Sequence, residues 1–288
     1  MTRIFGILIA VLFLSVGHTA SAQDSELLKK AQDGDAEAQF ALGRAYDYGE
    51  GVEQDFAEKV KWYRLAAEQG NARAQNNLGY AYHHGEGVEQ DYAEAIKLWR
   101  LAAEQGTAVA QYNLGSAYDY GEGVEQNFAE AVKWYRLAAE QGDAIAQNSL
   151  GYAYRNGEGV EQDYVEAVSW FRLAAEQGNA GAQDNLGYAY RNGEGVEQDY
   201  VEAFKWYRLA AEQGNTPAQN NLGAAYFKGR GAIQDVVYSH MWFNISASLG
   251  NMGATEAIDV VAEEMTPEQI AEAQKLAREC VRKAYKDC

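Results

Sequence analysis

Few side chains of this 288-residue chain could do covalent or metal chemistry: two cysteines, four histidines and many carboxylates. Cys280 and Cys288 are eight residues apart, and one continuous helix would separate them by about 12 Å, too far for a disulfide. An even number of cysteines in an exported chain nevertheless favours a structural bridge. We therefore expect the last helix to end near Tyr285 and the tail to fold back. The absence of a C-x-x-C motif argues against redox catalysis.

Metal binding and hydrolytic catalysis find little support. His83 and His84 are adjacent, and adjacent side chains on a helix point about 100° apart, so they cannot easily bind one ion together. A site combining His83 with Asp47 and Asp119 is conceivable, but polarity of a binding surface is the simpler interpretation. His240 is expected to make a single polar contact. The chain has no Ser-x-x-Lys, G-x-S-x-G or H-E-x-x-H motif. We expect no metal, no cofactor and no catalytic residue.

Charge and composition narrow the class of partner. The chain has 42 acidic and 24 basic residues, a formal net charge of -18. Such a surface repels phosphate backbones, so no nucleic-acid partner is expected. With 20 Tyr, 6 Trp and 9 Phe the chain must pack into a core instead of staying disordered. Its 29 Gly beside only 2 Pro require a structural reason.

The N-terminus has the pattern of a targeting segment. Arg3 precedes an apolar stretch, residues 4–16, that is too short to span a bilayer. Ala20, Ser21 and Ala22 then supply small residues for cleavage. We expect a signal peptide at residues 1–22, cleaved after Ala22, and a periplasmic or secreted mature protein without a membrane span. An uncleaved membrane anchor is the alternative.

A 36-residue unit repeats six times and predicts the domain organisation. Leu-Gly recurs every 36 residues from position 42 to position 222. GEGV recurs five times and decays to GRGA at Gly229, and LAAEQG becomes ISASLG at Ile245. The predicted repeats are 35–70, 71–106, 107–142, 143–178, 179–214 and 215–250. An N-terminal half-repeat cap is expected at 23–34 and capping helices at 251–288.

Each repeat predicts two helices. The first follows a side chain that can cap an N-terminus, such as Asp35 or Thr107, and runs about thirteen residues to the first Gly of GEGV. The second opens with a predicted capping box, such as Asp55 with Glu58. Thr266 and the proline after it predict the start of a longer closing helix. Short helices without a strand signal predict an all-α fold, a right-handed α/α superhelical solenoid of helical hairpins.

At these positions the chain resembles the Sel-one-like repeat family, relatives of the tetratricopeptide repeats. The residues that carry the resemblance are A-x-A-Q-x-x-L-G-x-A-Y, then G-x-G-V, then A-x-x-W-Y-x-x-A-A-E-Q-G in each repeat. The resemblance implies an adaptor that holds other proteins on a concave groove. With the export signal, it implies a bacterial member of the periplasm or of the secreted proteins.

Comparison of the repeats with one another separates scaffold from variable surface. Residues such as Leu42 and Gly43 recur in every repeat at helical spacing, which indicates core. Positions equivalent to 40, 44 and 47 vary, lie largely on one helix face and are rich in Tyr, Asn and Arg, as in protein-binding surfaces. Drift of an exposed face is the alternative. The residues expected to contact a partner are Phe40, Arg44, Asp47, Tyr80, His83, Tyr112, Asp119, Tyr152, Arg155, Asn156, Tyr188, Arg191 and Asn192.

A Tyr-x-x-Arg-Asn pattern occurs twice, with Arg155 and Arg191 as its cations. Arg presents a planar fork that suits a carboxylate, so we expect these residues to meet an acidic segment or a free carboxylate of a protein or peptide. The alternative is that they pair with the loop acids Glu158 and Glu194. The functional expectation is a non-enzymatic protein-interaction scaffold of the bacterial envelope. A peptidoglycan or carbohydrate binder, or a regulator of cell-wall enzymes, is the alternative function.

Overall fold

The computed structural model describes residues 22–288, so the predicted signal peptide lies outside the described residues except for Ala22. This part of the chain contains fifteen helices and no strand, which confirms the predicted all-α class and the helical hairpins. The helices fall into two units, one ending at Gln90 and one running from Asp91 to Cys288.

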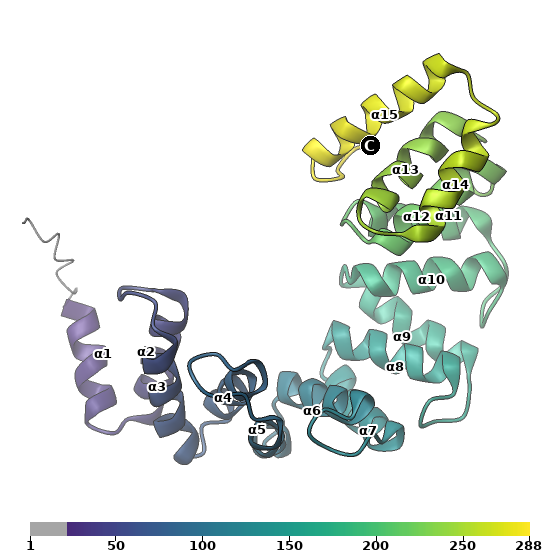
Figure 1. Cartoon of the computed structure of the whole chain (residues 1–288). Coiled ribbons are helices and arrows are strands. Elements are labelled where there is room, and N and C mark those ends of the chain that lie inside the picture. The colour runs from purple at the N-terminus through teal and green to yellow at the C-terminus, as the bar shows by residue number, and fades with distance from the viewer. Residues whose placement is uncertain (1–21) are drawn as a thin grey trace, which may run out of the picture. The chain divides into compact units, whose positions relative to one another are not determined.

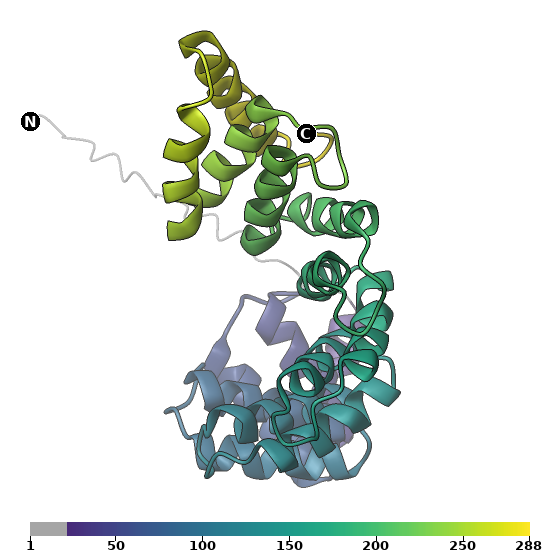
Figure 2. The ribbon, with the colours of Figure 1, turned by 90° about the vertical axis from the view of Figure 1, so that its right-hand side faces the viewer.

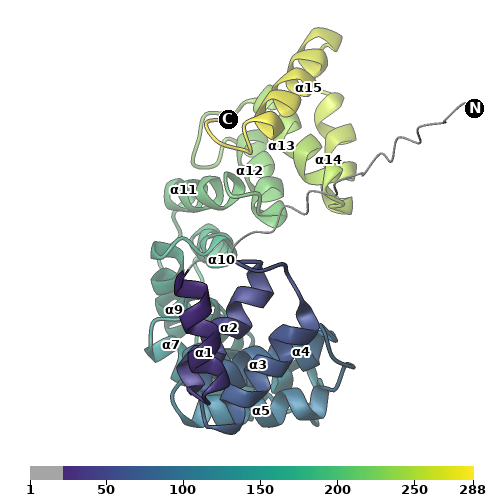
Figure 3. The same cartoon turned by 90° about the vertical axis from the view of Figure 1, so that its left-hand side faces the viewer.

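The first unit contains four helices, drawn in purple and blue in Figures 1 and 3. They are α1 (Ala22–Gln32), α2 (Ala36–Tyr48), α3 (Phe56–Glu68) and α4 (Ala72–His84). Each packs against the next along the chain. The apolar side chains of α1, α2 and α3 bury Leu42 and Trp62 between them.

The second unit contains the remaining eleven helices of the described chain. They are α5 (Tyr92–Glu104), α6 (Ala108–Tyr120), α7 (Phe128–Glu140), α8 (Ala144–Asn156), α9 (Tyr164–Glu176), α10 (Ala180–Asn192), α11 (Tyr200–Ala211), α12 (Thr216–Lys228), α13 (Val236–Ser248), α14 (Met252–Ala262) and α15 (Pro267–Arg282). Consecutive helices pack on one another from α5 to α14, and α15 returns to pack on α13 (Figures 1 and 2). Each helix therefore buries its apolar side against its neighbours in the stack.

Helix ends follow the predicted caps with two differences. The first helix of each repeat ends at a glycine in the left-handed region, such as Gly157 with φ 74°. The side chain of Thr107 does not cap α6, although its position is that of the N-cap. Asp55 caps α3 through the amides of Ala57 and Glu58, but the reciprocal half of the predicted box is not made. Glu58 instead accepts hydrogen bonds from Lys61 and Trp62.

Two glycines show why the repeat contains so many. A Cβ on Gly187 would lie 2.8 Å from the ring of Tyr207, so the helices of this hairpin approach more closely than a side chain would allow. Gly195, at φ +69°, lies in the loop between α10 and α11, and its Cβ would lie 2.1 Å from the carbonyl oxygen of Tyr164. The loop of one repeat thus rests on the second helix of the repeat before it.

Buried glutamines connect successive repeats. Gln147, 4% exposed, donates to the carbonyl of Ala139 and accepts from Gln177, at 3.1 and 2.8 Å. The equivalent Gln183 makes the same two bonds. Because each glutamine reaches the helix before it and the helix after it, the bonds satisfy polar groups that stacking removes from water.

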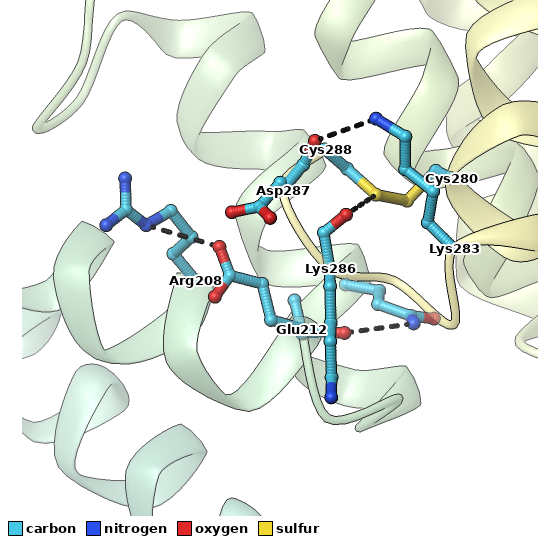
Figure 4. Close-up of a disulfide and its surroundings, with 9 residues drawn as sticks. Arg208, Glu212, Cys280, Lys283, Lys286, Asp287 and Cys288 are labelled. Atoms are coloured by element: carbon cyan, nitrogen blue, oxygen red, sulfur yellow. Dashed lines mark hydrogen bonds and ion pairs between the residues drawn. A yellow bond between two sulfur atoms is a disulfide. The ribbon is translucent and has the colours of Figure 1, made fainter.

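The C-terminal tail is fastened by a disulfide between Cys280 and Cys288, whose Cα atoms lie 5.4 Å apart (Figure 4). Thr266 caps α15 and Pro267 occupies its first turn, as predicted. The helix ends at Arg282, earlier than the predicted Tyr285. The reason is that Ala284 and Tyr285 take positive φ values of 51° and 67°, which turns the chain back toward the helix. The bridged tail packs against buried side chains of α11 and α13.

Candidate functional site

The residue equivalent to Asp47 of the first repeat, near the end of each first helix, determines the chemistry of the variable face. In the third repeat it is Asp119, whose Oδ2 accepts a 3.0 Å hydrogen bond from the hydroxyl of Tyr135 on α7. Burial raises the pKa of Asp119, and the bond from Tyr135 opposes that rise. Tyr112 stacks on the same ring with centroids 5.7 Å apart. In the third repeat, the predicted contact residues Tyr112 and Asp119 are therefore both engaged with Tyr135 of their own chain.

In the fourth and fifth repeats the same position carries arginine. Arg155 donates from Nη1 to Oδ1 of Asn185 at 3.0 Å, and Arg191 donates likewise to Asn221 at 3.2 Å. Each acceptor belongs to the first helix of the following repeat. Neither arginine forms an ion pair with Glu158 or Glu194 within the described residues. The alternative of pairing with the loop acids is therefore not observed, and both guanidinium groups keep donors for another ligand.

Tyrosine rings hold these arginines in place. The Cζ of Arg155 lies 4.9 Å from the ring centroid of Tyr152 and 5.5 Å from that of Tyr188. Arg191 lies 4.9 Å from the centroid of Tyr188. Tyr188 therefore lies close to both guanidinium groups, an arrangement that orders the cations by cation–π attraction. We call Tyr152, Arg155, Tyr188 and Arg191 the tyrosine–arginine face.

A hollow of about 450 Å³ lies on this face between the fourth and fifth repeats, beside Arg155 and Tyr188. Asn156 and Asn192, which follow the two arginines, are exposed at the ends of α8 and α10. Asp184 also lines the hollow and accepts a 2.9 Å bond from Asn221. Burial raises the pKa of Asp184, while its hydrogen bond and the charges of the two arginines lower it by less.

Five of the predicted contact residues, Phe40, Arg44, Asp47, Tyr80 and His83, lie in the first unit. Phe40 is only 6% exposed, because its ring packs on Tyr63, and so it offers a partner little area. Asp47 accepts bonds from Tyr63 and from Lys59 at 3.2 and 2.9 Å. Arg44 and Tyr80 are exposed, and Tyr80 contacts His84.

Lys59 is a residue that the sequence analysis missed. It is 2% exposed and also bonds to Glu86 at 2.8 Å. Burial alone would lower its pKa, but the two carboxylates bonded to it raise that pKa above its ordinary value. The signal was available, because the equivalent positions of the next four repeats are all alanine: Ala95, Ala131, Ala167 and Ala203.

No group of three His, Cys, Asp or Glu side chains within the described part of the chain could hold a metal ion, and His83 therefore stands outside any such cluster. None of the described helices is both long and apolar enough to cross a membrane. His240 contacts Asn244 in α13, and burial lowers its pKa.

Comparison with known proteins identifies the repeat. The family described as the Sel1 repeat matches this chain six times, at residues 36–71, 72–107, 108–143, 144–179, 180–215 and 216–251. No curated protein matches the chain.

Among the crystal structures similar to this chain are two with 36% identity or more. One is a protective antigen of uropathogenic Escherichia coli strains that displays an SLR fold, with 40% identity and a TM-score of 0.78. The match covers 91% of this chain but only 57% of that protein. The other is a Sel1 repeat protein from Oxalobacter formigenes, with 36% identity, a TM-score of 0.71, and 77% and 89% coverage.

Proposed function

We propose that this chain, which belongs to the Sel1 repeat family, is a non-enzymatic scaffold that binds a protein or peptide on its tyrosine–arginine face. Sel1 repeat proteins generally mediate protein–protein interactions, and their repeats are generally non-catalytic. The observation that carries the proposal is that rings and amides order Arg155 and Arg191, while neither forms an ion pair with a carboxylate of residues 22–288, although Asp184 lies near enough to interact with both charges.

The chemistry of the face suggests what a partner presents to it. Two guanidinium groups lie close together on a chain of net charge -18, with Asp184 and Glu194 also lining the hollow beside Arg155. An acidic segment, or a free carboxylate, would pair with their remaining donors, and the tyrosine rings supply rigid apolar area beside them. A polysaccharide of the cell wall could use the same rings by stacking, but a neutral sugar would leave the arginine charges without a counterpart.

We further propose that the protein acts outside the cytoplasm, in the periplasm or after secretion. The predicted signal peptide and the disulfide at the C-terminus support this location, since disulfides persist in oxidising compartments. The similar Escherichia coli protein is named a protective antigen, which is consistent with exposure to a host. Intact mass of the exported chain should correspond to a first residue of Gln23, and a retained N-terminal segment would contradict this part of the proposal.

The decisive experiment compares captured partners between two double variants. Arg155→Gln with Arg191→Gln removes both cations of the face. Lys97→Gln with Lys133→Gln removes the same charge from two exposed lysines, each of which pairs with a glutamate of its own helix. Immobilised wild-type and control proteins should retain the same envelope proteins, identified by mass spectrometry, and the arginine variant should lose them. Equal retention by all three proteins would exclude this face as the binding surface.

A further inference from the structure

A small cavity with an unusual lining lies one repeat beyond the tyrosine–arginine hollow. It has a volume of about 280 Å³ and is formed by α10, α11, α12 and the loop after α12. Three of its lining residues are cations: Arg191, Lys228 and Arg230. None of the lining residues is acidic, in a chain that has 42 acidic residues. The equivalent hollow of the preceding repeat, by contrast, is lined by Asp184 and Glu194 as well as by Arg155.

The wall of this cavity contains a buried hydroxyl without a hydrogen-bond partner. Tyr207 lines the cavity and is 1% exposed, and its Oη is bonded to no atom of the described chain. In the third repeat the equivalent Tyr135 donates to Asp119. In the fifth repeat the position of that aspartate is occupied by Arg191, which cannot accept a hydrogen bond. Tyr207 therefore has a donor to offer, and a bound acceptor would remove the cost of leaving it unmet.

One residue of the cavity lining is smaller than its equivalents in the two preceding repeats. Ala224 stands where the fourth and fifth repeats carry Tyr152 and Tyr188. Together with Ala203 and Phe204 it gives the cavity apolar lining beside the cations. The volume is at the low end for ligand sites, so the cavity suits one residue and not a whole folded segment.

The cations, the free hydroxyl donor and the apolar residues of the cavity together complement the C-terminal residue of a polypeptide. A C-terminal residue combines a carboxylate with an adjacent side chain, whereas an inorganic anion has no apolar part to place against Phe204. We infer that this cavity binds the C-terminal residue of a peptide, with its carboxylate facing Arg191, Lys228 and Tyr207 and its apolar side chain facing Phe204. The inference rests on the proposed function, since it takes the partner to be a protein or peptide.

The test uses a minimal probe with the full mature chain. The probe is acetyl-Gly-Gly-Leu with a free carboxylate, and its C-terminal amide is the matched control ligand. Binding is followed by nuclear magnetic resonance shifts of labelled arginine side chains. The free acid should saturate these shifts, and the amide should bind at least about tenfold more weakly, because it lacks the charge that the cations pair with.

Variants assign the binding to this cavity. Lys228→Gln and Tyr207→Phe should each weaken binding of the free acid at least about threefold. Lys205→Gln should leave it unchanged, because Lys205 lies on α11 but pairs with Glu202 outside the cavity. The inference would be overturned if the wild-type protein bound the free acid and the amide equally. It would also be overturned if the Lys228→Gln and Tyr207→Phe variants bound the free acid as tightly as the wild-type protein does. Binding of inorganic phosphate or of acetyl-Gly-Glu-Gly amide as tight as that of the free acid would overturn it as well.

The two proposals fail separately. If the probe does not bind, but capture of partners still depends on Arg155 and Arg191, the carboxylate cavity is excluded and the scaffold function stands. If the probe binds, but capture does not depend on the two arginines, the tyrosine–arginine face is excluded as the partner surface.

Discussion

The third and fourth repeats (residues 107–178) differ from the fifth and sixth (residues 179–250) in how completely they satisfy their own polar groups. In the former, every buried side-chain polar atom has a partner. In the latter, the Oη of Tyr207, the Oε1 of Gln219 and the Oγ of Ser239 are buried without one. Backbone and helix lengths hardly change between these regions, so the difference comes from a few substitutions on a common scaffold. The third and fourth repeats use their buried polar groups in hydrogen bonds within the chain, whereas the fifth and sixth keep some of these groups available for a ligand.

The largest expected effect on stability is that of replacing a loop glycine in either region, and it should be similar in both because they share one scaffold. Gly159→Ala and Gly195→Ala each place a Cβ within 2.3 Å of backbone atoms of the preceding repeat, at positive φ. Each should lower the free energy of unfolding by about 3 kcal/mol or more. Gly142→Ala, with a positive φ but no atom within 4 Å, should cost only about 1 kcal/mol. Urea denaturation measures all three, and a much smaller loss for Gly195→Ala would mean that the later repeats are loosely packed.

A pair of tyrosine variants tests the comparison directly. Tyr135→Phe removes the bond to Asp119 and leaves that half-buried carboxylate short of a donor, so it should cost about 2 kcal/mol. Tyr207→Phe removes a buried hydroxyl that bonds to nothing in the described chain, so it should not lower stability and should raise it by up to about 1 kcal/mol. Equal losses in denaturant midpoint would show that Tyr207 has a partner in solution and would weaken the cavity proposal.

A third prediction concerns a glutamine that the fourth repeat has and the sixth repeat lacks, which one substitution can add and another can remove. Leu249 of the sixth repeat stands where Gln177 of the fourth repeat donates to Gln147, and the corresponding Gln219 has an unmet Oε1. Leu249→Gln should supply the missing donor and raise stability by about 1 kcal/mol, because Leu249 is 47% exposed and loses little apolar burial. Gln177→Leu should lower stability by a similar amount. Thermal melting checks both variants, and a destabilised Leu249→Gln would show that the sixth repeat has no geometry for this bond.

The smallest effect depends on pH and concerns Asp184. Burial raises the pKa of this carboxyl in the folded protein, so its charged form destabilises the fold. Below the pKa of the unfolded chain the group is neutral in both states and the penalty is absent. The penalty develops as pH rises through the pKa of the folded state.

Asp184→Asn should therefore raise the denaturation midpoint at pH 7, and its advantage should disappear in acid. The amide can still accept from Asn221, as Asn148 accepts from Asn185 at 3.0 Å one repeat earlier. Asn148→Asp is the reverse substitution and should lower the midpoint at pH 7. An advantage for Asp184→Asn that grows in acid would contradict the assigned cause.

Much of the fold could be predicted because its determinants are local and repeated. Asp55 as an N-cap, Gly157 as a helix stop and Thr266 before Pro267 each act within one turn of helix. The predictions were wrong where a side chain had two possible hydrogen-bond partners close to it in the sequence. Glu58 binds Lys61 instead of completing a capping box, since both partners lie within three residues of it.

The candidate site could be located from the variable positions, but its contacts could not. The repeat pattern placed Arg155 and Arg191 on one helix face, and their spacing gave no means of choosing between a loop acid and an amide of the next repeat. The structure selects Asn185 and Asn221, each 30 residues further on. Phe40 shows the same limit, because its burial depends on Tyr63, a residue of another helix.

The period of 36 residues, the hairpin fold and the position of the variable face follow from residues within each repeat, since helix caps, left-handed glycines and apolar spacing act over a few residues. Which polar atoms are satisfied and which are left open depends on how one repeat is stacked on the next. Within residues 22–288 the hydroxyl of Tyr207 lacks a partner because Arg191 stands where an aspartate would accept its bond, and the cavity beside it is lined jointly by α10, α11 and α12. Contacts between separate helices decide both features, so they become visible only when the chain is folded.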